Sequence, residues 1–237
     1  MVQYIYGKNA VIQRIKSKHS ITKLYLTKQN FNTLQALIQK DKLSYEIVSS
    51  QRLDQMVKGV HQGLVAAIEP YALQDLETVV NRLDLTTEDH ILVLCDQLED
   101  PHNLGAILRT ADAVGVAAVI IGKHRSIGLT PTVAKVSTGA IETVPVCEVT
   151  NLAKACDYLK QKGFWIIGAD NDETVDYRKM PKDRNVVLVV GSEGRGISNL
   201  VKKQCDYLVK IPMVGVVSSL NVSVATGILL YELVRDK

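Results

Sequence analysis

The part of the sequence that most constrains the fold begins at His90, where short apolar segments alternate with amphipathic ones. Six segments rich in Val and Ile are predicted strands: Ile91–Leu94, Ala117–Ile121, Thr143–Val146, Phe164–Gly168, Val186–Val190 and Tyr207–Ile211. The predicted helices are Asn103–Val114, Pro131–Thr138, Leu152–Lys162, Ile197–Gln204 and Asn221–Arg235. Strands that are apolar on both faces are typical of a parallel sheet covered by helices on both sides. The pattern predicts an α/β fold with a mostly parallel sheet.

The first 68 residues differ in charge and in pattern. They contain ten Lys and Arg against three acidic residues, a net charge of +7, whereas the rest of the chain carries −4. Alternating elements predict a small α/β/α unit with helices at 8–15, 30–39 and 52–57 and strands at 21–26, 45–48 and 63–68. Because Lys and Arg neutralise phosphates and release counterions, the charge favours a polyanion partner. A solvated basic surface would explain the same charge. We predict domains at 1–69 and 90–237, with residues 70–89 as a linker.

Composition excludes several classes of protein. No apolar run approaches the roughly 18–20 residues that span a bilayer, and the first residues lack the pattern of a secretory signal. The four cysteines are widely spaced without a C-x-x-C pair, and the five histidines do not cluster with them. We therefore expect free thiols in the cytoplasm, no metal site and no membrane partner.

Three loops that follow predicted strands are candidate ligand sites, because ligands of such folds bind at the carboxyl ends of strands. The first loop, residues 96–103, leads into a helix on which Gly105, Arg109 and Asp112 share the face opposite the apolar stripe. Asn103 is placed to cap this helix. An exposed helix arginine usually has no specific role, so the loop alone leaves the function of Arg109 open.

The second loop, Gly191–Gly196, has three glycines in six residues, which lets the backbone approach a ligand closely. Its spacing differs from the G-x-G-x-x-G dinucleotide motif, and the carboxylate of Glu193 would oppose a pyrophosphate, so a dinucleotide-dependent oxidoreductase is disfavoured. The third loop runs from Ile211, at the end of the last predicted strand, to Ala225 in the last predicted helix, and in it Ser219 or Asn221 could simply cap that helix. Capping does not explain the polar Ser223 within that apolar helix.

Together the three loops resemble the motifs of the SpoU (TrmH-type) RNA ribose 2′-O-methyltransferases of the SPOUT superfamily. The matching segments are Asn103-Leu104-Gly105 through Arg109-Thr110-Ala111, Gly191-Ser192-Glu193-Gly194-Arg195-Gly196, and Ile211-Pro212-Met213 with Ser218 to Ala225. The opening Tyr4 to Val11 and His61-Gln62-Gly63 resemble the L30e-like RNA-binding domain that some members carry. This pairing resembles the branch that methylates guanosine in bacterial 23S ribosomal RNA.

The resemblance implies a C-terminal trefoil knot, a homodimer, and S-adenosylmethionine as methyl donor without a metal. The residues implied to contact this cofactor through their backbone are Gly191, Gly196, Ile211, Met213 and Leu220. The residues implied to be catalytic are Arg109, Asn103, Glu193, Ser219 and Asn221. The resemblance assigns Arg109 to the ribose hydroxyl, either as base or as stabiliser of the developing alkoxide. Since a guanidinium remains protonated in proteins, we expect Arg109 to be the stabiliser. The other four residues would orient Arg109 and the ribose.

The motifs fix the chemistry more firmly than the substrate. A tRNA ribose 2′-O-methyltransferase is the alternative within the same class. A non-catalytic RNA-binding factor of ribosome assembly is the alternative from another class, although such a binder would not need Arg109, Glu193 and Asn221 together.

Overall fold

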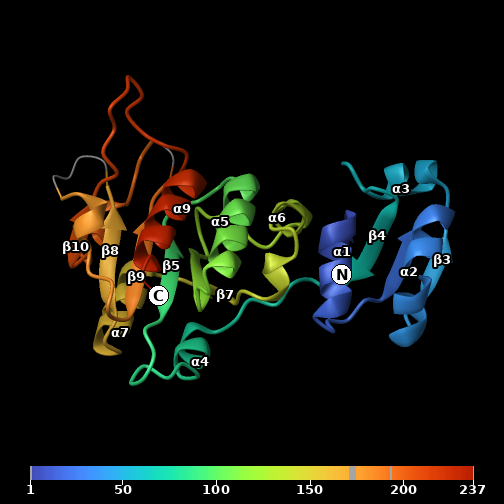
Figure 1. The fold of residues 1–237 in the computed structure, drawn as a ribbon, viewed down its shortest axis with the longest axis horizontal. Helices are drawn as coiled ribbons and strands as arrows, with labels where there is room; N and C mark the ends of the chain where they lie inside the picture. Colours follow the sequence, from blue (N-terminus) through green and yellow to red (C-terminus); the bar gives the residue numbers. More distant parts are fainter. Residues whose placement is uncertain (1, 171–174, 193, 237) are drawn as a thin grey trace. The chain divides into compact units, whose positions relative to one another are not determined.

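The computed structural model describes residues 2–170, 175–192 and 194–236 (Figure 1). Glu193 therefore lies outside the described residues. Contacts divide the chain into two compact units, which are described separately. Unit 1 comprises Met1–Ala72 and Leu129–Thr143, and unit 2 comprises Leu73–Gly128 and Val144–Lys237. The sequence placed residues 129–143 with the later strands, whereas their contacts are with the first 72 residues. The functional domains 1–69 and 90–237 stay a prediction.

Unit 1 is built on a four-stranded sheet with the strand order β1-β4-β2-β3. Strands β2 and β3 are parallel, and the pairs β1–β4 and β2–β4 are antiparallel. Its elements are β1 Gln3–Tyr6, α1 Lys8–Lys16, β2 Lys23–Leu26, α2 Lys28–Lys40, β3 Tyr45–Ile47, α3 Ser50–Met56, β4 Leu64–Ile68, α6 Pro131–Val136 and the 3₁₀ turn η1 Ala140–Glu142. The sequence did not predict β1, which is held by its antiparallel pairing with β4.

Unit 2 contains a six-stranded sheet with the strand order β10-β8-β9-β5-β6-β7, and each neighbouring pair is parallel. This confirms the predicted α/β fold with a mostly parallel sheet. Its strands are β5 Ile91–Cys95, β6 Ala118–Gly122, β7 Val146–Val149, β8 Trp165–Ala169, β9 Val186–Val190 and β10 Tyr207–Val209. Its helices are α4 Leu76–Val80, α5 Pro101–Ala113, α7 Leu152–Gln161, η2 Tyr177–Lys179, α8 Asn199–Lys202 and α9 Val222–Leu233.

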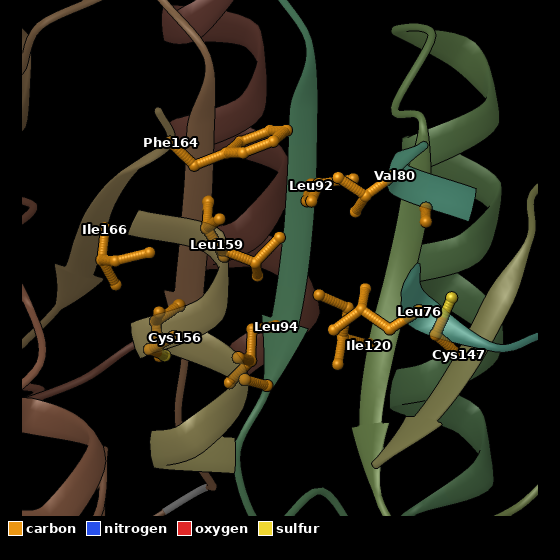
Figure 2. Close-up of a cluster of buried hydrophobic side chains, with 14 of the residues drawn as sticks. Leu76, Val80, Leu92, Leu94, Ile120, Cys147, Cys156, Leu159, Phe164 and Ile166 are labelled. Atoms are coloured by element: carbon orange, nitrogen blue, oxygen red, sulfur yellow. The ribbon is translucent and has the colours of Figure 1, made fainter. Parts of the chain in front are cut away.

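Helices cover both faces of this sheet, as its doubly apolar strands require. On one face, buried side chains of α4, α7 and α8 form a cluster with alternate residues of the strands (Figure 2). Leu92 and Leu94 of β5 point into this cluster, so Ile91, Val93 and Cys95 point to the other face. There, α5 contacts β6, α9 contacts β9, and the two helices pack on each other. Helix α5, which carries Asn103 and Arg109, and helix α9, which Asn221 caps, therefore lie on one face.

Some predicted boundaries were wrong for physical reasons. Helix α5 begins at Pro101, because Asp100 caps it by accepting a hydrogen bond from the His102 amide at 2.8 Å. Strand β7 begins three residues later than the predicted Thr143, because the chain first forms η1. Residues 70–89, whose role as a linker stays a prediction, contain α4, and its buried Leu76, Val79 and Val80 belong to the core of unit 2.

A buried acid ties residues 129–143 to the start of the chain. The side chain of Glu142 is 1% exposed, and its Oε2 lies 3.2 Å from Arg14 Nη1 and 2.6 Å from His19 Nδ1. The Tyr71 hydroxyl donates to Glu142 Oε1 at 2.8 Å. Burial, with Glu142 beside it, raises the pKa of Tyr71, so the hydroxyl stays a donor. Four groups from three parts of the sequence thus form one buried network within unit 1.

We predict that Glu142→Ala destabilises unit 1 by about 3–5 kcal/mol, because it leaves the guanidinium of Arg14 buried without its carboxylate. Urea unfolding of the full chain, followed by circular dichroism, measures this loss. The matched control is Glu46→Ala, which removes the exposed partner of Lys23, and it should leave the unfolding midpoint almost unchanged. Equal midpoints for the two variants would contradict the stabilising role of the network.

Candidate functional site

A cavity of about 330 Å³ lies within unit 2 at the carboxyl ends of β8, β9 and β10. This is the edge at which parallel sheets bind ligands, and the volume is within the range of small-molecule sites. The lining residues are Ala169, Asp170, Val190, Gly191, Ser192, Gly194, Arg195, Gly196, Val209, Ile211, Met213, Ser218, Ser219, Leu220, Val222 and Ala225. All five residues predicted to contact a cofactor are among them, so the structure brings the second and third loops together around one cavity.

The glycine loop that follows β9 folds back on itself. Ser192 and Gly196 exchange two backbone hydrogen bonds, of 3.2 and 2.9 Å, which close a narrow turn. A Cβ atom at Gly191 would lie 2.0 Å from the carbonyl carbon of Gly196, so no larger residue fits there. Gly194 and Gly196 have φ values of 82° and 65°, in the left-handed region that favours glycine. At both positions an added Cβ would meet nothing within 4 Å, which leaves open space beside the main chain.

Asp96 holds this loop in place, a role that the sequence analysis missed. Its carboxylate is buried at the end of β5, with the residue 2% exposed, and accepts a 2.7 Å hydrogen bond from the amide of Ser198. The Asp96 amide donates to the carbonyl of Val190 at 2.8 Å. The signal was present in the sequence, because an acidic residue directly after a buried strand needs hydrogen-bond partners.

A second link joins the first and third loops. Asn221 Nδ2 donates to Asn103 Oδ1 at 2.9 Å, so two predicted catalytic residues are in contact. Asn221 also caps α9, because its Oδ1 accepts from the Ser223 and Val224 amides and from the Ser223 hydroxyl at 2.6 Å. The predicted capping role of Asn103 is wrong, since Asn103 is the third residue of α5 and is 6% exposed.

Arg109 lies on the exposed side of α5 and does not line the cavity. It follows Asn103 by six residues, or about 9 Å along the helix axis. Ser219 is exposed at the mouth of the cavity, and Glu193 is not among the described residues. Among the described residues of one chain, Ser219 therefore lines the cavity, and Asn103 and Asn221 lie beside it. Arg109 of the same chain does not line the cavity.

The cavity also contains polar groups that the sequence analysis did not single out. Asp170, at the end of β8, forms a 2.9 Å ion pair with Lys202. The buried hydroxyl oxygen of Ser192 has no hydrogen-bond partner among the residues that the structure describes. These two groups offer an acceptor and a hydroxyl to a bound ligand.

Thiol and metal chemistry find little support at this edge of the sheet. Burial, with Asp96 beside it, raises the pKa of Cys95 to about 12, so this thiol remains neutral and a poor nucleophile. Over the described ranges 2–170, 175–192 and 194–236, no three His, Cys, Asp or Glu side chains group in a way that could hold a metal ion. In the same ranges, no helix has the length and apolar content needed to cross a bilayer.

Known proteins similar to this chain match it over almost its whole length. A chain of Bacillus subtilis (strain 168), YacO, assigned to the TrmH family of tRNA/rRNA methyltransferases, is 44% identical, with 99% of this chain and 96% of the relative covered. A Staphylococcus haemolyticus protein with the same family assignment is 47% identical, with 98% and 95% covered. The SpoU methyltransferase AviRb of Streptomyces viridochromogenes, crystallised with the cofactor AdoMet, has 25% identity and a TM-score of 0.84, with 98% of this chain and 89% of that chain covered.

Two family models match the chain in series. Residues 4–74 match the RNA 2′-O ribose methyltransferase substrate-binding family, and residues 90–231 match the SpoU rRNA Methylase family. The second match contains all three loops that surround or adjoin the cavity. The resemblance predicted from the motifs is confirmed: this chain belongs to the SpoU (TrmH-type) family of RNA methyltransferases.

Proposed function

We propose that this protein methylates the 2′-hydroxyl of a guanosine ribose in 23S ribosomal RNA. The coarser part follows from the family: the chain is an RNA 2′-O-methyltransferase that uses S-adenosylmethionine. The observation that carries the proposal is the cavity that the second and third loops line together. The rRNA substrate is supported by the description of the matched catalytic family and by the +7 charge of the first 68 residues. The guanosine rests on the resemblance of the paired domains alone.

The residues that line the cavity suit a polar methyl donor. Main chain with open space beside Gly194 and Gly196 allows close contact with a ligand, and the Ser192 hydroxyl and Asp170 carboxylate supply polar partners. When bound, the donor supplies a methyl group on a positively charged sulfur. We propose that the backbone of Gly191, Gly196, Ile211, Met213 and Leu220 holds it. The third loop would pass through the second to form a trefoil knot, a route compatible with the return of the chain from edge strand β10 to α9 beside β9.

The chain's own residues must activate a weak nucleophile. The ribose oxygen forms a bond to the methyl carbon as the carbon–sulfur bond breaks, and the hydroxyl proton passes to a base. The guanidinium of Arg109 would stabilise the negative charge that develops on this oxygen. Asn103 and Asn221, joined by their 2.9 Å hydrogen bond, would fix the start of α5 against the start of α9. Ser219 and Glu193 would orient the ribose.

The deciding experiment offers labelled S-adenosylmethionine with separate 23S, 16S and tRNA pools and maps the alkali-resistant linkages that result. Label at one guanosine of 23S RNA supports the proposal. Label in tRNA alone would replace it with the tRNA ribose methyltransferase. Absence of both label and cofactor binding would favour a non-catalytic RNA-binding factor of ribosome assembly.

Gly191→Ala should weaken S-adenosylmethionine binding by about 10–100-fold, because the new methyl group overlaps the Gly196 backbone and forces the glycine loop open. Isothermal titration calorimetry measures the affinity. Gly215→Ala is the matched control, since a Cβ there meets nothing within 4 Å, and its affinity should equal that of the wild type. Wild-type affinity in Gly191→Ala would remove this loop from the cofactor site.

Arg109→Ala should lower kcat for methyl transfer by about 10²–10³-fold, the usual loss when a donor to a developing oxyanion is removed. Cofactor affinity should stay within about two- to threefold, because Arg109 does not line the cavity. Single-turnover transfer to 23S RNA and calorimetry with the cofactor separate the two effects. Normal turnover of Arg109→Ala would exclude Arg109 from the mechanism.

A homodimer would reconcile the exposed Arg109 with a catalytic role, because a partner subunit could bring its own substrate or loop to that face. Val224 and Tyr231 of α9 are 51% and 59% exposed, and their spacing of seven residues places them on one side of the helix. Val214 and Val216 of the third loop are fully exposed. Large apolar side chains exposed on one side of a helix and on the loop that leads into it are found at protein interfaces. We propose that a second copy of this chain covers them.

Tyr231→Glu should shift the protein toward monomer, because the dimer would have to bury an unpaired charge. Sedimentation velocity at several concentrations measures the distribution. Leu200→Glu is the matched control: Leu200 is 71% exposed on α8 and should tolerate the charge without a change of state. A wild type that sediments as a monomer would overturn the dimer proposal.

A cytoplasmic location, in keeping with the four free cysteines, is also part of the proposed function.

A further inference from the structure

We propose that the loop after β6, residues 123–126, binds the phosphate backbone of the target RNA strand beside the active site. The inference rests on the proposed function, since it assumes an RNA substrate. It adds a second group of cationic side chains, within unit 2 itself, to the basic residues of the first 68. Lys123, His124 and Arg125 carry it, and all three side chains are exposed.

The position of this loop follows from the sheet. Strands β5 and β6 are parallel neighbours with Cys95 opposite Ile121, so the loops that follow them leave the same edge side by side. The amide of Ile127 donates to the carbonyl of Leu98 at 2.8 Å, which fastens one loop to the other. The loop that begins with Asp96 leads into α5, which carries Asn103 and Arg109. The basic side chains therefore start from the edge that holds the first motif.

The backbone of the loop is held in an uncommon conformation. Arg125 has a φ of 54°, and Gln97 in the facing loop has a φ of 58°, both in the left-handed region that residues other than glycine rarely adopt. The amide of Lys123 donates to Val149 at 2.9 Å, so both ends of the loop are anchored. Strained backbone that is anchored in this way is found preferentially at binding and catalytic sites. Here it fixes the backbone positions from which the side chains of Lys123, His124 and Arg125 extend.

The charge of this region suits a polyanion. The facing loop carries two exposed acids, Glu99 and Asp100; the Asp100 carboxylate accepts from the His102 amide at the start of α5, where the positive end of the helix dipole offsets part of its charge. Lys123 and Arg125 add two positive charges, and a guanidinium can hold a phosphate through two parallel hydrogen bonds. Phosphate contacts of this kind position an RNA without reading its sequence. We therefore assign the loop to positioning of the strand, and target selection to other contacts.

The test compares the wild type with the double variant Lys123→Ala, Arg125→Ala, using a 23S RNA fragment. Two lost phosphate contacts should flatten the slope of log binding constant against log salt by about 1.4–1.8. RNA affinity should fall roughly tenfold per contact at low salt. KM for RNA should rise accordingly, while cofactor affinity and kcat stay close to wild type. Unchanged cofactor affinity also reports that unit 2 is folded.

Two further variants sharpen the result. Lys203→Ala removes an exposed lysine of the same unit that lies outside the loop after β6, at the C-cap of α8, and it should leave affinity and salt slope unchanged. Arg125→Lys keeps the charge and should keep the slope. If the double variant itself loses cofactor affinity, the single variant Arg125→Gln replaces it, and a flatter salt slope of RNA binding is again the expected result.

The outcomes separate this inference from the proposed function. An unchanged salt slope and KM in the double variant overturn the inference, even when the wild type methylates 23S RNA. A flatter salt slope in the double variant supports the inference. Because RNA binding is measured directly, this result stands whichever RNA pool accepts the methyl group. A double variant that binds RNA normally but no longer binds an acidic protein would assign the loop to a protein partner and overturn it.

Discussion

The hydrogen bond between the Asp96 carboxylate and the Ser198 amide is the interaction on which the geometry of the site depends most. It is buried at the carboxyl end of β5 and fastens the far end of the glycine loop. Asn103, seven residues after Asp96, accepts a hydrogen bond from Asn221 and so holds the start of α9. The first loop and its helix therefore hold both of the others. Because buried polar groups without partners are costly, the three loops stabilise one another. A change in the first loop should therefore disturb the shape of the cavity, although that loop does not line it.

The sequence predicted the layers of the fold more reliably than the junctions between them. Strand β9 was predicted with its observed bounds, Val186–Val190, because five consecutive Val and Leu residues leave no other reading. Strand β7 was misplaced because Thr143 and Val144 have strand propensity, yet the Thr143 hydroxyl donates to Ala140 and closes η1. Helix α5 started earlier than predicted because the Asp100-Pro101 pair is a better start than Asn103. Local chemistry decided each of these boundaries.

Neighbours that are distant in sequence could not be predicted in the same way. Nothing in the composition of residues 129–143 indicates that Glu142 meets Arg14, His19 and Tyr71. Those contacts depend on tertiary structure, and a reading of periodicity sees only local order. The five predicted cofactor residues did converge on one cavity, because their loops follow strands β9 and β10 at one edge of a parallel sheet. Arg109 did not, since a helix carries its later residues away from that edge.

The site divides its work between main chain and side chains. The cavity is lined by glycine-rich backbone, so its shape tolerates few substitutions, and Gly191 tolerates none with a Cβ at its observed position. The surroundings that would meet RNA are long exposed side chains, such as Arg109, Lys123 and Arg125. A methyl donor of fixed structure suits a rigid backbone, whereas a flexible polyanion suits long charged side chains. It follows that changes of RNA substrate within this fold can arise from exposed loops, while the glycine turn that is proposed to hold the donor stays the same.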